Sequence, residues 1–188
     1  MSRGVSDKTK RLTVSALLAA MGVALLLVGA LFETLDLTMA ALASFLCIFA
    51  VIELGGFYPW LIFAVTGILS VLLMPQSMGG WFYLLFFGCY PIFKEKLERL
   101  NKYFAWIIKI VLLNVALIIC IAVASFLFYG GDILTTFNFI FGDAEKGTKM
   151  AIAVYALVNL VFVIYDIALT RLISFYLIKL RHRFKFLK

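Results

Sequence analysis

The chain has 188 residues, of which 65% are hydrophobic and 14% are charged, and its formal net charge is +7. This composition is far more apolar than that of a soluble domain, so it excludes an ordinary soluble fold. The charge does not indicate a nucleic-acid partner, because the basic residues gather in three clusters beside apolar segments, a pattern that orients membrane helices. The cysteines lie inside apolar segments without CxxC spacing or a neighbouring histidine, so we expect neither a metal site nor a disulfide framework.

The first predicted span covers about residues 12 to 32 and contains no charged residue. About 20 apolar residues are enough to cross a hydrocarbon core of ~30 Å as a helix, and they are too many for a signal peptide. Within this span Ala16, Ala20 and Ala24 recur at every fourth position and therefore lie along one ridge of the helix. Small residues at this spacing allow a second helix to approach closely in lipid. The sequence therefore predicts that this ridge docks a partner helix.

Five further apolar segments follow, separated by polar or glycine-containing breaks. Gly55 and Gly56 interrupt a long apolar run, so we expect a helical hairpin there. The fourth segment is short and could form a re-entrant hairpin, but a full crossing returns the basic residues 94 to 102 to the cytoplasm. The second to sixth predicted spans cover about residues 37 to 52, 57 to 74, 80 to 93, 103 to 129 and 150 to 178.

The distribution of lysine and arginine predicts the orientation of these spans. With both termini in the cytoplasm, thirteen of the 17 basic residues lie in cytoplasmic segments, and only Lys146 and Lys149 lie in outside segments. Five spans would break this agreement. The sequence therefore predicts an all-α membrane protein, in which residues 1–188 form one integral membrane domain. This domain is a six-transmembrane-helix bundle with both termini cytoplasmic.

No motif for catalysis is found. Residues 142 to 149 resemble a phosphate-binding loop, but the order Gly147-Thr148-Lys149 differs from the Gly-Lys-Ser/Thr order that brings a lysine to the phosphates. No Ser/His/Asp arrangement and no metal-ligand spacing is present. We therefore expect a protein that is not an enzyme and has no catalytic residues, metal or cofactor.

Several ionisable residues lie within or beside apolar segments, where charge is costly and usually faces the bundle interior. One hypothesis is a proton or ion relay in the cytoplasmic half of the bundle. The alternative is a set of internal ion pairs that fix the helix register, with Lys109 and Arg171 reaching the interface. The lack of a second acidic residue at mid-membrane favours this alternative. The residues in question are Glu53, Lys109, Asp166 and Arg171.

Polar and aromatic residues also gather at the predicted outward end of the bundle. Aromatic walls with a few oriented polar groups suit a pocket for a small-molecule ligand. An ordinary aromatic belt with solvated loops explains the same pattern equally well. Asn159 is the least ordinary member, because it lies roughly two turns into the membrane. The candidate substrate-binding residues are Glu33, Asp36, Trp81, Tyr83, Tyr129, Asn138, Tyr155 and Asn159.

The whole pattern resembles the substrate-binding S component of energy-coupling factor (ECF) transporters, which are small six-helix proteins with cytoplasmic termini. In that family an AxxxA-type ridge on the first helix docks onto the transmembrane T component, and Ala16, Ala20 and Ala24 match it here. The resemblance implies a vitamin or related micronutrient bound near the outer face, a gate at residues 33 to 37, and two ATPase subunits in trans. The topology and the absence of a targeting segment suit a bacterial plasma (inner) membrane.

Two other functions are compatible with the same pattern. Small bacterial scaffolds of the rod-shape MreD type have a similar size and hydrophobic layout, and they hold partners of the cell-wall machinery in the membrane. In that case the alanine ridge is a partner interface and no ligand exists. A proton-coupled carrier that works alone would instead need Asp166 and Lys109 to titrate.

Overall fold

The computed structural model describes residues 2–98, 101–128, 130–131 and 144–180. Within these ranges the chain is helical apart from short turns, and no strand is found. Four of the described helices contain stretches that are long and apolar enough to cross a membrane: Asp7–Leu31, Asp36–Glu53, Tyr103–Leu127 and Lys149–Ile178. The expectation of an all-α membrane protein with several spans is therefore confirmed.

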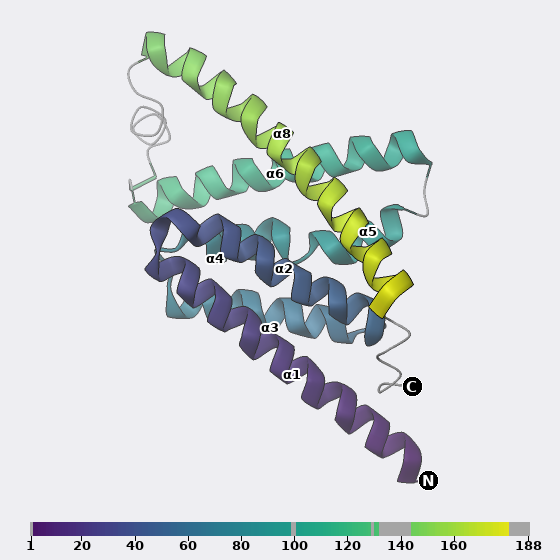
Figure 1. Cartoon of the computed structure of the whole chain (residues 1–188). Helices are drawn as coiled ribbons and strands as arrows, with labels where there is room; N and C mark the ends of the chain where they lie inside the picture. The colour runs from purple at the N-terminus through teal and green to yellow at the C-terminus, as the bar shows by residue number, and fades with distance from the viewer. Residues whose placement is uncertain (1, 99–100, 129, 132–143, 181–188) are drawn as a thin grey trace. The chain divides into compact units, whose positions relative to one another are not determined.

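The first compact unit contains residues up to Ala116, and three long helices dominate it. Helix α1 packs along both α2 and α3, and its N-terminal turns project beyond them (Figure 1). A short 3-10 turn, η1, links α1 to α2. The bounds are Ser2–Leu31 for α1, Glu33–Leu35 for η1, Asp36–Glu53 for α2 and Tyr58–Leu73 for α3.

Two glycines make the turn between α2 and α3. Gly55 and Gly56 adopt φ angles of +61° and +59°, a left-handed conformation that glycine reaches without steric penalty. Pro59 then lies in the first turn of α3, where its missing N–H group leaves no hydrogen bond unmade. The turn that the sequence predicts at these glycines is present.

The segment predicted as the fourth span consists of three short helical pieces. They are α4 (Met78–Phe82), the π-helical η2 (Tyr83–Phe87) and α5 (Tyr90–Leu97). Gly88 separates the last two and lies so close to α3 that an added Cβ would be 2.5 Å from Phe63 Cδ2. Pro91 then lies in the first turn of α5. None of the three pieces reaches the length of a membrane span by itself.

Two clusters of buried side chains are found among the described residues of the first unit. The first joins α1, α2 and α3 and comprises Leu18, Ala19, Ala50, Leu54 and Ile62. The second joins α1, α2 and η2 and comprises Leu26, Ala40, Ala43 and Tyr83. Both clusters contain alanines of α2, because side chains this small allow the neighbouring helices to pack closely.

The second compact unit begins at Leu117. Helix α6 (Lys102–Phe128) starts in the first unit and continues into the second, which also contains α8 (Ala144–Phe175) and the π-helical η3 (Tyr176–Leu180). The helical stretch formed by α8 and η3 includes the whole range predicted as the sixth span. Helix α8 begins before that range. The predicted span starts later because the first turn of the helix is polar and only the residues that follow are apolar.

Candidate functional site

Helix α1 carries small residues on two different faces. Ala16, Ala20 and Ala24 are exposed, whereas Ser15, Ala19, Gly22 and Gly29 are buried. With 3.6 residues per turn, the centres of these two faces are roughly 150° apart around the helix axis. We call them the outer ridge and the inner face of α1. The inner face makes the contacts within the first unit, so the outer ridge stays accessible.

Glycines of the inner face allow α1 to touch its neighbours closely. A Cβ added at Gly22 would lie 2.9 Å from Thr66 Cγ2, and one at Gly29 would lie 2.8 Å from Met39 Cβ. The Thr66 hydroxyl also donates a hydrogen bond to the carbonyl of Ala19 at 3.3 Å. These packing residues are absent from the sequence prediction. Their signal is the run of small residues at positions 15, 19, 22 and 29, which return to one face at helical spacing.

A buried carboxylate joins the start of α2 to the start of α4. Asp36, which is 9% exposed, accepts hydrogen bonds from the Ser77 hydroxyl at 2.9 Å and from the Gly79 N–H at 2.7 Å. The Ser77 hydroxyl oxygen in turn accepts a bond from the Gly80 N–H at 3.2 Å and so caps α4. We call this arrangement the Asp36 link. It satisfies the N–H groups that a helix leaves without partners at its N-terminus.

Gly79 is a structural requirement of this link. An added Cβ would overlap Asp36 Oδ1 and would lie 2.6 Å from the Asp36 carbonyl oxygen. The backbone of α4 therefore approaches α2 to a distance that no other residue permits. The predicted ligand role of Asp36 stays a prediction, but its carboxylate already binds groups of the protein itself.

Two other candidate ligand residues lie beside the Asp36 link. The Trp81 indole N–H donates to the carbonyl of Pro75 at 3.0 Å and thereby holds the turn before α4. Tyr83 is 1% exposed and belongs to the core cluster with Leu26 and Ala40. Asp36, Trp81 and Tyr83 are thus gathered around α4, and each contacts neighbouring parts of the fold.

Two further candidate ligand residues, Tyr155 and Asn159, lie in the second unit. In the second unit Tyr155 is exposed, and the amide of Asn159 donates to the Tyr155 carbonyl one turn earlier at 2.9 Å. Tyr129, Asn138 and the side chain of Glu33 lie outside the described residues.

The predicted membrane charges differ in their surroundings. Lys109 and Asp166 are buried, Glu53 is half-buried and Arg171 is exposed. The Lys109 ammonium lies 5.4 Å from the centroid of the Trp106 ring, a geometry in which the ring face attracts the cation. Burial of this kind is compatible with both hypotheses, the relay and the structural ion pair.

Helix α5 carries a buried cation, Lys94, which the sequence predicts among the cytoplasmic basic residues 94 to 102. Lys94 is 1% exposed and makes an ion pair with Glu98 one turn later, with 3.4 Å between Nζ and Oε1. The signal in the sequence is its position on the buried face that Tyr90 and Leu97 define. The other ionisable groups near it, Glu95 and Lys96, are not part of that face.

These features define an α-helical, multi-pass membrane protein in which small-residue contacts and one buried carboxylate hold the first unit together. Among the described residues, no group of three or more histidine, cysteine, aspartate or glutamate side chains could hold a metal ion. A comparison of the chain with protein-family models, curated proteins and solved structures found no match.

Proposed function

We propose that this protein is the membrane-embedded substrate-binding subunit, or S component, of an ECF-type importer for a vitamin or related micronutrient. The observation that supports the proposal is the accessibility of the outer ridge of α1. Ala16, Ala20 and Ala24 are exposed although α1 packs against α2 and α3 through its inner face. The ridge is therefore available for a T component, as the resemblance implies.

The shape of the outer ridge suits a close helix–helix contact. Larger exposed side chains, those of Leu17, Met21 and Val28, lie along one flank of the alanines. A partner helix could therefore approach the backbone over the alanines while it contacts these apolar side chains. In lipid, where hydrophobic burial gives no net gain, such van der Waals packing is a main source of helix association.

The topology of the proposal is that of six crossings in the bacterial plasma membrane, with both termini in the cytoplasm. In this arrangement α4, η2 and α5 together make the fourth crossing, and helix α3 makes the third. The supporting argument is the distribution of charge, because this count places most of the basic residues on one side of the membrane.

At the outer end, we assign the Asp36 link a role in holding the gate of residues 33 to 37. Its bonds to Ser77 and Gly79 tie the start of α2 to α4. In the first unit Trp81 then stays the candidate for a ligand contact, and Tyr155 and Asn159 stay the candidates in the second unit.

A membrane scaffold of the MreD type is the second candidate function. The observation that favours it is the occupied outer end of the first unit, where Asp36 is bonded to Ser77 and Gly79 and Tyr83 is buried in the core. Side chains that are bonded to or packed against other parts of the same unit leave less space there for a ligand. Under this function the outer ridge of α1 holds a cell-wall protein.

Native mass spectrometry of the protein purified gently from its own host tests the proposal. We expect a small-molecule adduct together with a T component and two ATPase subunits. Ala20→Leu, which widens the ridge, should lose these subunits and keep the adduct, whereas the control Leu72→Met, at an exposed position of α3, should keep both. If Ala20→Leu retains all partners at wild-type yield, the docking assignment is wrong. Cell-wall proteins in place of ATPases, without an adduct, would identify a scaffold.

A further inference from the structure

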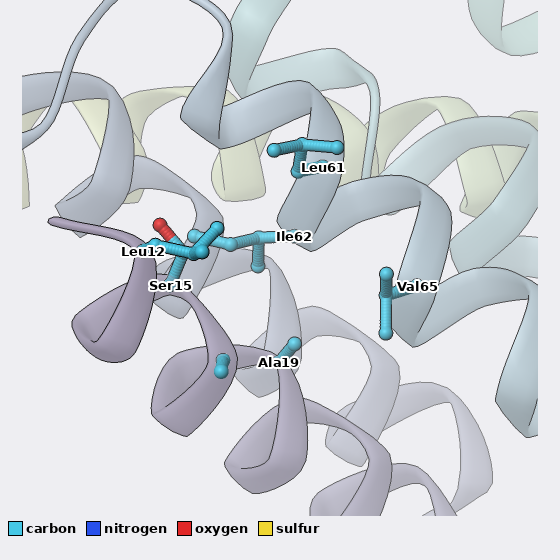
Figure 2. Close-up of a pocket in the computed structure, with 7 residues that line it drawn as sticks. Leu12, Ser15, Ala19, Leu61, Ile62 and Val65 are labelled. Atoms are coloured by element: carbon cyan, nitrogen blue, oxygen red, sulfur yellow. The ribbon is translucent and has the colours of Figure 1, made fainter. Parts of the chain in front are cut away.

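A small apolar groove lies between α1 and α3 in the first unit. Its volume is about 160 Å³, and Figure 2 shows side chains of both helices directed toward it. The only polar side chain in it is Ser15, whose hydroxyl donates to the carbonyl of Arg11 at 2.8 Å and is therefore satisfied within α1. The lining residues are Leu12, Ser15, Ala16, Ala19, Leu61, Ile62 and Val65.

The size and chemistry of the groove select a thin apolar occupant. An apolar protein cavity of about 150 Å³ stays dry and binds a molecule as small as benzene. A partner helix is about 10 Å wide, and a volume of about 160 Å³ cannot accommodate one. An open groove on a membrane helix faces lipid, which makes a lipid acyl chain the fitting occupant. Leu12 and Ala19 are roughly 11 Å apart along the axis of α1, enough for a segment of such a chain.

Basic side chains continue the groove toward the N-terminal end of α1. Lys8 and Arg11 each precede a groove residue by four positions, Lys8 before Leu12 and Arg11 before Ser15, and so lie on the same side of the helix. Lys8 is exposed. Arg11 donates one bond from Nη1 to the Leu54 carbonyl at 3.2 Å, and a guanidinium has further donors for a second acceptor.

The helix dipoles of α1 and α3 add positive potential at the end of the groove where Lys8 and Arg11 lie. Thr66 of α3 contacts Ala19 and Gly22 of α1, while Arg11 reaches Leu54 just before α3 begins. Helices α1 and α3 therefore run in the same direction. The N-terminal, positive ends of both helix dipoles lie on the side of the groove where Lys8 and Arg11 are found.

We propose that this groove binds one acyl chain of an anionic phospholipid, whose headgroup phosphate is bound by Lys8 and Arg11. The apolar lining selects the chain, and the two cations select an anionic headgroup over a zwitterionic one. The site differs from the outer ridge of α1, with which it shares only Ala16. The proposal does not depend on the transporter or the scaffold function.

Native mass spectrometry of the full chain in detergent, with added phosphatidylglycerol or phosphatidylcholine, tests this site. We expect the wild type to retain phosphatidylglycerol preferentially, and Lys8→Gln to weaken that binding about fivefold. Lys10 is the matched control, because its position places it on the opposite side of α1. Lys10→Gln should keep nearly wild-type affinity. Equal retention of the two lipids by the wild type, or equal effects of the two substitutions, would overturn the proposal.

A second variant and a labelling measurement separate the groove from general membrane contact. Val65→Trp fills the groove from the α3 side and should reduce retention of phosphatidylglycerol, whereas Ala20→Leu on the outer ridge should leave it unchanged. In nanodiscs, phosphatidylglycerol with a diazirine in its acyl chain should label residues 12–19 and 61–65 of the wild type. Equal labelling of Leu72, an exposed residue of α3 far from the groove, would contradict a specific site. Cross-linking of these residues to a protein subunit would assign the groove to another occupant.

Discussion

The inner face and the outer ridge of α1 use similar residues for different purposes. On the inner face, the glycines bring α1 so close to its neighbours that a single Cβ would approach Thr66 or Met39 to less than 3 Å. On the outer ridge, by contrast, the alanine side chains are exposed and are not buried by other parts of the first unit. Small residues at helical spacing thus indicate close packing, but they do not tell whether the partner belongs to the same fold. Substitutions on the two faces should therefore have opposite consequences.

Gly29→Val should give the largest loss of stability. Its Cβ would lie 2.8 Å from Met39 Cβ and 3.3 Å from the Cα of Asp36, so α2 would have to move. We expect a decrease of about 3 kcal/mol in the free energy of unfolding, the upper range for overpacked sites. The measurement is an SDS titration in mixed micelles, followed by far-UV circular dichroism. Ala24→Val on the outer ridge is the matched control and should change the free energy by less than about 0.5 kcal/mol.

Asp36→Ala should be the next most damaging change. It removes the acceptor for Ser77 and for the Gly79 N–H and leaves both donors in a buried place. Hydrogen bonds to a charged group contribute about 1.5–3 kcal/mol, so we expect a loss of about 2–3 kcal/mol in the same titration. Asp36→Asn, which keeps one acceptor oxygen, should lose less. An unchanged stability of both variants would show that the link does not hold α2 to α4.

The positions of the helices could be predicted well from the sequence, because glycine, proline and charged residues interrupt the apolar runs. The face of α1 that packs against α2 and α3 could not be predicted from the sequence. A helix that is apolar on all sides has no polar face to mark the side that is exposed, and in lipid either side can be exposed. The pairing of Asp36 was equally hidden, since Ser77 and Gly79 lie 41 and 43 residues away and meet it only through the packing of α4 on α2.

Tyr83 shows a third limit of the sequence prediction. Its place near the start of the fourth predicted span, at the predicted outward end of the bundle, made it a candidate for a ligand pocket. In the structure Tyr83 is the first residue of the π-helical segment η2, a geometry that α-helical spacing does not predict. Tyr83 is buried in the core cluster with Leu26 and Ala40.

Thr66→Val should have a smaller effect than the two changes above. It removes the hydroxyl that donates to the Ala19 carbonyl across the inner face and keeps the volume of the side chain. We expect a loss of about 1 kcal/mol, the usual contribution of a neutral hydrogen bond. Thr13→Val is the control, because the Thr13 hydroxyl donates to the Thr9 carbonyl at an exposed position of α1. A loss of equal size in both variants would mean that the inner contact adds nothing beyond the local bond.

Ala20→Leu should have the smallest effect on stability and the largest effect on assembly. Because Ala20 is exposed and lies on the face of α1 opposite the packed one, the free energy of unfolding should change by less than about 0.5 kcal/mol. At a close helix–helix interface the same side chain prevents the approach of the partner, and overpacking of about 1–3 kcal/mol weakens binding by about 5-fold to 150-fold. Both effects can be measured on one preparation: the yield of co-purified partner reports the effect on assembly, and the free energy of unfolding reports the effect on stability. A variant that loses more than about 1 kcal/mol of stability would place the outer ridge inside the protein's own fold, and the distinction between the two faces of α1 would then fail.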